Sequence, residues 1–242
     1  MGAVLDATPV AHGLTCHMAA VLTTADGRVF VKGVSAGDAE GMAGQSWETA
    51  VNPLVAGVAP LMLARVTAGG WDVLIFECVD GRHADLSPES PDVALVTKAL
   101  QATQDVAAGG LAPRLADRFG NHLDDAGRLL LAGDALLHTD TDPQNMLIAG
   151  DRAYMADWAK VAAGPAWVDV AYMAVLLMEA GWPSADALDW ARQFESWRRA
   201  DPVAVHALVA ATCRAGEARF GEAGAQPGKR RFQALLARDA AA

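Results

Sequence analysis

The stretch "LLHTDTDPQNMLIAGDRAYMADWA", residues 136–159, places acidic and amide side chains between short apolar runs. Two leucines precede the polar loop, and a Met-Leu-Ile run precedes a turn at Gly150–Asp151. A Gly-Asp pair between two apolar runs is typical of a β-hairpin. We therefore expect a short hairpin with a polar loop at each end, which would return Asp157 to the neighbourhood of Asn145.

The polar residues of this stretch form a chemically specific set. Asp140 and Asn145 lie five residues apart on a loop that contains Pro143, and Asp157 follows Asn145 by twelve residues. An amide oxygen and a carboxylate that face one point make a hard, oxygen-only site, which Mg²⁺ occupies together with phosphate oxygens. The remaining carboxylate can accept or orient the proton of a hydroxyl group.

Composition limits the class of protein. The chain has 242 residues, of which 52% are hydrophobic and 20% charged, enough for one large domain or for two lobes around a cleft. No apolar run approaches the ~18 residues that span a bilayer, and residues 1–13 lack the features of a signal peptide. Cys16, Cys78 and Cys213 lie far apart, as expected of isolated thiols. We expect a cytoplasmic protein.

The net charge of −10 and the pI near 4.9 argue against nucleic acid or an anionic membrane as a partner. Residues 117–157 are particularly acidic, with eight acids against three arginines. Such a surface favours a cationic ligand, although solubility is the more common reason for an acidic surface. The sequence does not indicate an oligomeric state.

The first eighty residues are mainly typical of strands. Two apolar runs around Asp26–Gly27 predict a hairpin, and a second hairpin is predicted to turn at Gly69–Gly70. Between them, residues 37–52 have a helical pattern that Pro53 ends.

From Pro91 onward the pattern is mainly helical. We expect one helix near residues 95–106, another over 111–123, and a central buried helix over 166–182, where apolar residues occur on every face. Three further helices are expected to begin after prolines, at Pro183–Ser184, Pro202 and Pro227. The fold class is therefore α+β, with a small β-rich part followed by a larger helical part.

The spacing His138-x-Asp140-x4-Asn145, followed by Asp157–Trp158, resembles the catalytic and metal-binding loops of the aminoglycoside phosphotransferase family. Members of that family are small-molecule kinases with a protein-kinase-like fold. Their usual pattern is His-Gly-Asp, then Pro-x-Asn, then Ile-Asp-Trp or Ile-Asp-Phe. Here the corresponding letters are "HTD", "PQN" and "MADW".

The resemblance implies a bilobal protein. Residues 1–80 would form a nucleotide-binding N-lobe with hairpins and one helix, and residues 81–242 a helical C-lobe with the catalytic loop and the acceptor site. ATP or GTP and Mg²⁺ would be the cofactors, and a hydroxyl group of a small molecule would receive the phosphoryl group.

Roles for the motif residues follow from the same resemblance. Asp140 would be the catalytic carboxylate, and Asn145 and Asp157 would bind the metal. His138 would pack under the catalytic loop as a structural residue, and Asp169, twelve residues after Asp157, would brace that loop from a helix.

The resemblance also assigns residues of the N-lobe. Lys32, in "RVFVKGV", would bind the α- and β-phosphates, and Glu48 on the predicted helix would orient it, with Glu40 as a competing partner. The backbone of Glu77 and Val79, in the connector between the lobes, would bind the adenine.

The sequence departs from the family pattern in two places. It lacks G-x-G-x-x-G, and the hairpin that would cover the phosphates, residues 10–22, contains Gly13 as its only glycine. Lys160 follows Asp157 by three, where many relatives have a neutral or acidic residue. These departures keep open the alternative of a nucleotide-binding module with little transfer activity.

For the acceptor, the acidic balance favours a cationic antibiotic such as an aminoglycoside or a basic peptide, and hence a role in antibiotic inactivation or self-resistance. Asp142 and Glu179 would bind ammonium groups, and Trp182 would stack on a ring or cation. A metabolic kinase for choline, homoserine, a sugar or a macrolide is the alternative within the same fold.

Overall fold

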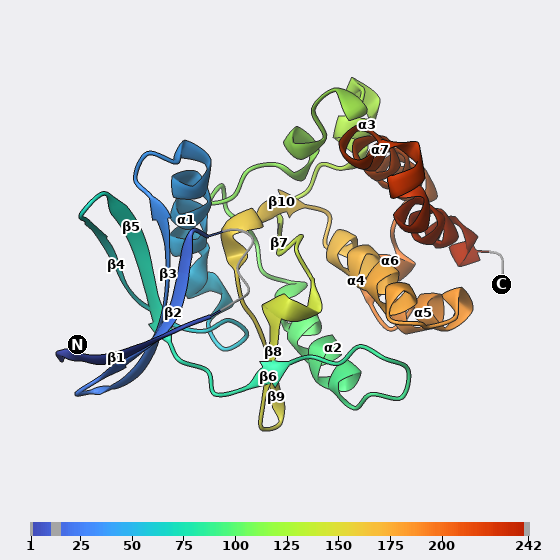
Figure 1. The fold of residues 1–242 in the computed structure, drawn as a ribbon. Coiled ribbons are helices and arrows are strands. Elements are labelled where there is room, and N and C mark those ends of the chain that lie inside the picture. Colours follow the sequence, from blue (N-terminus) through green and yellow to red (C-terminus); the bar gives the residue numbers. More distant parts are fainter. Residues whose placement is uncertain (1, 11–15, 240–242) are drawn as a thin grey trace.

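The computed structural model describes residues 2–10 and 16–239. Its N-terminal part is an antiparallel five-stranded sheet with the order β1-β2-β3-β5-β4 (Figure 1). The strands are β1 (Val4–Pro9), β2 (Met18–Thr24), β3 (Gly27–Ser35), β4 (Met62–Ala68) and β5 (Trp71–Glu77). Both predicted hairpins are confirmed. The second turns through Gly69 and Gly70, whose φ angles of 59° and 80° suit residues without a Cβ atom.

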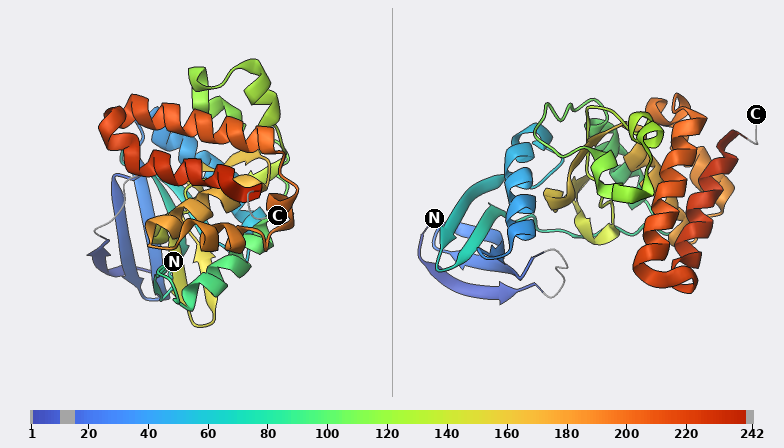
Figure 2. Two further views of the ribbon diagram at one scale, coloured as in Figure 1. Left: turned by 90° about the vertical axis from the view of Figure 1, so that its right-hand side faces the viewer. Right: turned by 90° about the horizontal axis from the view of Figure 1, so that it is seen from above.

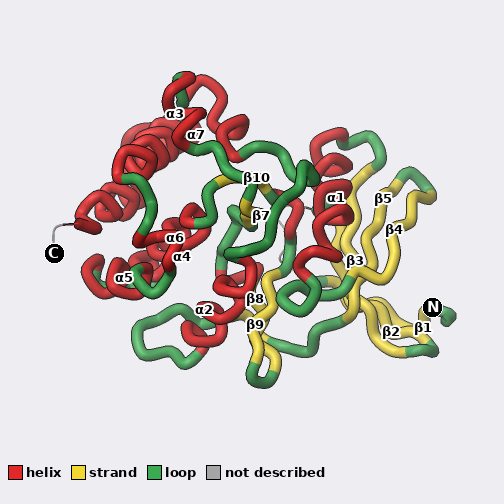
Figure 3. Tube along the Cα trace, turned by 180° about the vertical axis from the view of Figure 1, so that it is seen from behind, coloured by secondary structure: helices red, strands yellow, loops and turns green. Residues whose placement is uncertain are grey.

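One long helix, α1 (Ala39–Val51), is inserted between β3 and β4, and the 3₁₀ turn η1 (Asn52–Val55) follows it. The carboxylate of Asp38 caps the helix by accepting a hydrogen bond from the backbone of Gly41. The predicted helix over residues 37–52 is thus confirmed. Figure 3 shows that α1 lies between the sheet and the rest of the molecule.

The chain leaves the sheet through a connector that includes β6 (Arg82–His83). This strand joins β8 (Met146–Ala149) and β9 (Arg152–Met155) in a small sheet with the order β6-β8-β9. The β8–β9 hairpin turns at Gly150, as the sequence predicts, and aligns Met146 with Met155. Just outside it, β7 (Ala135–Leu137) pairs with β10 (Ala162–Gly164).

The remainder is mainly helical and lies on the far side of the small sheets (Figures 1 and 3). Its helices are α2 (Asp92–Thr103), α3 (Asp125–Leu130), α4 (Trp167–Glu179), α5 (Ser184–Ala191), α6 (Glu195–Arg198) and α7 (Pro202–Ala234). The 3₁₀ turns are η2 (Leu115–His122), η3 (Pro143–Asn145), η4 (Trp158–Lys160) and η5 (Leu235–Asp239). The α4 helix is the predicted buried one, and most of its residues are inaccessible to solvent.

Two details of the helical prediction are wrong. Residues 115–122 form 3₁₀ turns interrupted at Gly120, whose φ of 49° and ψ of −122° lie outside helical space. The final helix does not begin after Pro227. The break comes at Gly221, where a φ of 72° reverses the chain, and Pro227 lies within the second arm. Figure 2 shows the two arms of α7 side by side, and Lys229 joins Glu217 across them at 2.5 Å.

The packing confirms the predicted α+β bilobal class, with a small core inside the five-stranded sheet and a larger one in the helical part. Val51, Val55 and Ala59 belong to the larger core although they precede residue 80. The end of α1 therefore packs with the helical part, and the division at residues 80/81 stays a prediction. None of the described helices combines the length and hydropathy needed to cross a membrane.

Candidate active site

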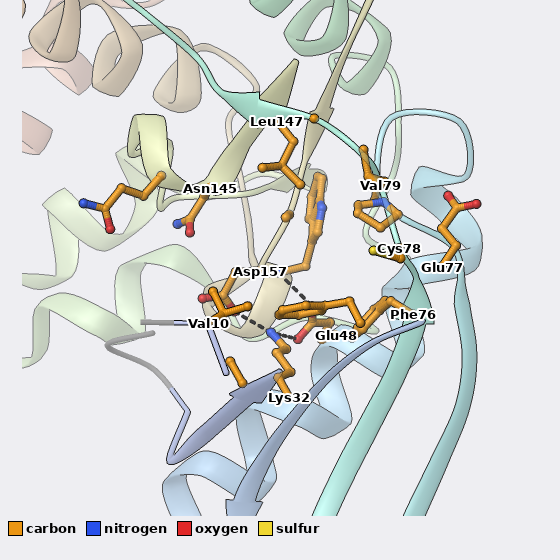
Figure 4. A pocket seen from close by; sticks show the side chains of 18 of the residues that line it. Val10, Lys32, Glu48, Phe76, Glu77, Cys78, Val79, Asn145, Leu147 and Asp157 are labelled. Atoms are coloured by element: carbon orange, nitrogen blue, oxygen red, sulfur yellow. Dashed lines mark hydrogen bonds and ion pairs between the residues drawn. The ribbon is translucent and has the colours of Figure 1, made fainter. Parts of the chain in front are cut away.

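The centre of the site is a buried cation with two acidic partners. Lys32 on β3 is 6% exposed, and its Nζ lies 2.5 Å from Glu48 Oε2 and 2.6 Å from Asp157 Oδ1 (Figure 4). Burial by itself lowers the pKa of Lys32, but the charges of Glu48 and Asp157 outweigh burial and raise this pKa above its ordinary value. Lys32 therefore stays charged at neutral pH.

Glu48 connects this cation to the other lobe. It lies on the buried face of α1, and its Oε1 accepts a hydrogen bond from the backbone N–H of Trp158 at 3.3 Å. Burial raises the pKa of Glu48 against the opposing charge of Lys32. Glu40, in the exposed first turn of the same helix, makes no such contact, so the structure brings Glu48 rather than Glu40 to Lys32.

A glycine allows the close approach of α1 to the segment after Asp157. A Cβ atom at Gly44 would lie 3.2 Å from the carbonyl oxygen of Ala159, closer than side chains normally come to a backbone oxygen. Gly44 therefore lets the helix that carries Glu48 rest directly on η4.

The loop that carries Asp140 is held in place by α4. Asp169, in the first turn of this helix and 2% exposed, accepts hydrogen bonds from the backbone N–H groups of His138 at 2.6 Å and Thr139 at 2.9 Å. These two bonds fix a loop in which Thr139 adopts a left-handed φ of 62°. Burial raises the pKa of Asp169, whereas His138 and the two N–H donors act in the opposite direction.

The ring of His138 is buried within the loop. Its Nε2 lies 2.8 Å from the carbonyl oxygen of Ala156, and its Nδ1 lies 3.2 Å from the backbone nitrogen of Asp140. These partners require the ring proton on Nε2, so that Nδ1 can accept from Asp140. The ring also meets Trp158 edge to face, with centroids 4.6 Å apart. This geometry uses both ring nitrogens within the loop.

Asn145 and Asp157 come together at the ends of the β8–β9 hairpin. The amide nitrogen of Asn145 donates to the carbonyl oxygen of Asp140 at 2.9 Å, which leaves its side-chain oxygen for a ligand. The backbone oxygen of Asn145 accepts from Ala156 at 2.7 Å, next to Asp157. Asp157 itself has left-handed backbone angles, φ 63° and ψ 63°, which turn the chain sharply from β9 into η4.

This donor set fits Mg²⁺ bound jointly with a nucleotide. The described residues contain no group of three or more His, Cys, Asp or Glu side chains that could hold a metal on its own. Mg²⁺ commonly uses one or two protein oxygens and completes its octahedron with phosphate and water. An amide oxygen from Asn145 and a carboxylate oxygen from Asp157 correspond to that mode.

A cavity of about 290 Å³ contains these groups. Lys32, Glu48, Asn145 and Asp157 all line it, together with apolar side chains from both lobes. Asp140 does not line the cavity, but it adjoins it through the hydrogen bond from Asn145. The structure thus brings the predicted phosphate, metal and catalytic residues to one place.

The apolar end of the cavity lies at the connector. Val21, Phe30 and Phe76 line it from the sheet, and Leu147 lines it from β8 (Figure 4). Leu147 was missed by the sequence analysis. Alternation along β8 would have indicated it, because Met146 and Ile148 are buried and the residue between them faces the other way.

Glu77 and Val79 both line the cavity, as expected for residues beside a base. The side chain of Glu77 turns away in Figure 4, and its Oε1 accepts from the backbone of Leu61 at 2.9 Å. The backbone N–H of Glu77 donates to the Leu61 carbonyl at 2.9 Å and is therefore in use.

The three residues predicted to bind the acceptor do not line the cavity. Asp142 is exposed and caps η3 by accepting from the backbone of Gln144 at 2.8 Å. Glu179 is exposed and pairs with Arg231 at 3.3 Å. Trp182 packs on the large core and donates to the carbonyl oxygen of Leu86 at 2.8 Å. Gly13 of the expected phosphate-covering hairpin lies outside the described residues.

Lys160, which departs from the family pattern, lies against the carboxylate that is predicted to be catalytic. Lys160 Nζ is 2.8 Å from Asp140 Oδ2. The carboxylate of Asp140 is therefore held by a cation just outside the cavity.

The sequence matches no protein-family model and no curated protein. Several solved structures are nevertheless similar in fold. An aminoglycoside phosphotransferase, APH(4)-Ia, solved with AMP-PNP and hygromycin B, matches with a TM-score of 0.64 and 12% identity. The match covers 99% of this chain and 96% of that one.

Two further matches are kinases of small alcohols. The choline kinase LicA from Streptococcus pneumoniae has a TM-score of 0.64 and 13% identity, covering 97% of this chain and 94% of its own. An ethanolamine kinase from Plasmodium vivax has a TM-score of 0.62 and 10% identity, covering 95% and 81%. The chain therefore has the protein-kinase-like fold that these aminoglycoside, choline and ethanolamine kinases share.

Proposed function

We propose that this protein is an O-phosphotransferase that uses ATP or GTP with Mg²⁺ to phosphorylate a hydroxyl group of a small molecule. The observation that carries the proposal is the ion pair between Lys32 and Asp157, which joins the two lobes inside a cavity that Asn145 also lines. The similarity in fold to a choline kinase and to an aminoglycoside phosphotransferase solved with AMP-PNP supports it.

The nucleotide would lie between the lobes. The apolar end of the cavity, with Phe76 and Leu147, suits a planar base, and Lys32 at the other end suits phosphate oxygens. Glu48 would keep Lys32 in place. Mg²⁺ held by Asn145 and Asp157 would neutralise charge on the phosphates and orient them.

Asp140 would act on the acceptor. Its carboxylate would accept a hydrogen bond from the incoming hydroxyl, whose oxygen forms a bond to the γ-phosphorus as the bond from that phosphorus to ADP breaks. The hydroxyl proton would pass to Asp140. Because the transition state is loose, placement and charge neutralisation supply most of the acceleration.

The charge of the acceptor is the finer part of the proposal. A cationic antibiotic remains our expectation, because the chain carries a net charge of −10, and APH(4)-Ia was solved with hygromycin B. The side chains first named for this role are engaged elsewhere, so the expectation rests on overall charge. An ATP-dependent reaction is compatible with the expected cytoplasmic location.

A second candidate is a nucleotide-binding module with little transfer activity. The contact between Lys160 and Asp140 favours it, because an ammonium group that already donates to this carboxylate competes with an acceptor hydroxyl for it. Measuring ADP release with and without acceptors separates the two. Tight nucleotide binding without acceptor-dependent release would favour the second candidate.

The proposal is tested by comparing two acids. Asp140→Ala should abolish most turnover, by about 100-fold or more, with nearly unchanged affinity for Mg-ATP. Asp157→Ala should weaken Mg-ATP binding itself, by about tenfold or more, because it removes a metal ligand. Asp151→Ala, at the exposed β8–β9 turn, removes the same charge outside the cavity and serves as the control.

Affinity is measured by calorimetry, and turnover by ADP release with a panel of amino sugars, basic peptides and neutral or anionic alcohols. Equal loss of Mg-ATP binding in the Asp140 and Asp157 variants would contradict the assigned roles. Turnover of only neutral or anionic alcohols would show that the expectation of a cationic acceptor is wrong.

A further inference from the structure

The proposed reaction gives no role to Lys160, although this residue contacts Asp140. It is the last residue of η4, three residues after Asp157, and its Nζ lies 2.8 Å from Oδ2 of Asp140. The side chain of Lys160 is 51% exposed and that of Asp140 26% exposed, so the pair is open to solvent and to ligands. No other described side chain donates a hydrogen bond to this carboxylate, which leaves Oδ1 for a hydroxyl group.

The backbone on either side of this pair is tied together. The hydroxyl of Thr139 donates to the carbonyl oxygen of Lys160 at 2.6 Å. The guanidinium of Arg118 contacts the same hydroxyl and also donates to the carbonyl oxygen of Val161 at 2.8 Å. These hydrogen bonds join the residue next to Asp140 to the backbone of Lys160 and Val161. They hold the backbone of Lys160 beside the loop that carries Asp140.

Stability alone does not account for this arrangement. An ion pair as exposed as this one contributes little to the stability of the fold. Lys32, the other lysine of the site, is buried in the cavity and held by two carboxylates. Among the residues that the structure describes, Lys160 is therefore the lysine in contact with Asp140.

This ammonium would lie within reach of a phosphoryl group transferred beside Asp140. A hydroxyl oxygen hydrogen-bonded to Asp140 lies about 2.7 Å from the carboxylate, and the phosphorus that it attacks lies about 3–3.5 Å further on. Lys160 is in contact with the same carboxylate and has a flexible four-carbon stem. Phosphoryl oxygens at that position would therefore lie within hydrogen-bonding reach of its Nζ.

The charges change in a direction that favours such a move. As the hydroxyl proton passes to Asp140, the carboxylate becomes neutral and its attraction for the ammonium disappears. At the same moment negative charge is carried by the phosphoryl oxygens. The ammonium group therefore loses one partner just as another becomes available.

We propose that Lys160 forms a phosphoryl-binding subsite on the acceptor side. It holds Asp140 before the reaction and binds the oxygens of the transferring phosphoryl group during it. This inference rests on the proposed phosphotransferase function and adds one residue to it. Lys160 then acts in the transition state rather than in nucleotide binding.

The test uses a mimic of the transferring group and needs no acceptor. Affinity for Mg-ADP is measured by calorimetry with and without aluminium fluoride, which binds beside ADP where the phosphoryl group would be. We expect the full-length protein to gain affinity with fluoride. Lys160→Met should keep the Mg-ADP affinity within about twofold but lose about tenfold or more of the fluoride-dependent gain.

Two further variants serve as controls. Lys160→Arg should retain most of the gain, because it keeps the positive charge. Lys98→Met removes an exposed lysine on α2 and should change neither affinity nor gain. Melting temperatures of all variants should agree, because the pair contributes little to stability.

The outcomes separate this inference from the proposed function. Failure of the unmodified protein to bind Mg-ADP would remove the proposed function itself. Binding of Mg-ADP without a fluoride gain, or a full gain in Lys160→Met, would overturn the subsite alone. The subsite would also be overturned if Lys160→Met lost as much affinity for Mg-ADP alone as for Mg-ADP with fluoride. The same holds if Lys160→Arg lost as much of the fluoride-dependent gain as Lys160→Met.

Discussion

The ammonium group of Lys32 lies 2.6 Å from the carboxylate of Asp157, although 125 residues separate them in the chain. Lys32 belongs to the five-stranded sheet, and Asp157 follows the β8–β9 hairpin of the other lobe. Glu48 completes the group from α1. The two lobes are therefore joined at the point where nucleotide phosphates would bind, and several consequences can be measured.

The first concerns the stability of this buried group. Lys32→Met would leave Glu48, which is 2% exposed, without its cation. We expect the free energy of unfolding to fall by about 3 kcal/mol, as when one partner of a buried ion pair is removed. The double variant Lys32→Met/Glu48→Gln should lose less, because it no longer buries an unpaired charge. Denaturant unfolding of the single and double variants measures the difference, and equal losses would contradict the pairing.

The pH dependence of nucleotide binding follows from the same group. The pKa of Lys32 is raised above its unfolded value by Glu48 and Asp157. The contribution of its charge to stability is therefore complete below the ordinary lysine pKa of about 10.4 and is lost only as pH rises through the higher folded value. We expect affinity for Mg-ADP to show no loss from Lys32 between about pH 7 and 10. The expectation would be contradicted if affinity for Mg-ADP declined in that pH range and Lys32→Arg abolished the decline.

The hydrogen bonds from Asp169 to the loop that carries Asp140 give a third prediction. Asp169→Asn replaces one accepting oxygen with an NH₂ group that would face the backbone N–H of either His138 or Thr139. We expect a loss of about 2 kcal/mol in the free energy of unfolding. Turnover should fall more than nucleotide affinity, because the loop carries Asp140. Asp186→Asn, on the exposed start of α5, is a matched control, and equal stability of the two variants would be evidence against these hydrogen bonds.

The packing of α1 on η4 gives a fourth. Gly44→Val would place side-chain atoms against the carbonyl oxygen of Ala159, which already lies 3.2 Å from the Cβ position. The helix would have to move away, and Glu48 would lose its contacts with Lys32 and Trp158. We expect weaker Mg-ADP binding, by about tenfold. Ala43→Val introduces the same β-branched residue one position earlier and serves as the control. If Ala43→Val weakened Mg-ADP binding as much as Gly44→Val, helix propensity rather than packing would be responsible.

Local sequence determined much of the fold. The hairpins turn at Gly27, Gly69–Gly70 and Gly150, where positive φ angles suit glycine and short-range pattern is sufficient. The buried helix α4 could be predicted from its apolar residues. The closeness of Asn145 and Asp157 could also be predicted, because the hairpin between them returns the chain to its starting point. The reversal at Gly221 was not, because a proline six residues later gave the stronger local signal.

Tertiary structure decided the partners of individual side chains. Glu48 rather than Glu40 reaches Lys32 because α1 docks on η4 through Gly44.

The residues predicted for the acceptor were assigned by composition, but their partners come from distant segments. Glu179 pairs with Arg231 on the second arm of α7, and Trp182 donates to Leu86 in the loop before α2. The contact between Lys160 and Asp140 likewise depends on how the loop that carries Asp140 packs against η4. Motif spacing determines which groups are present, whereas hydrogen bonds and ion pairs between segments far apart in the chain depend on packing that no local pattern encodes.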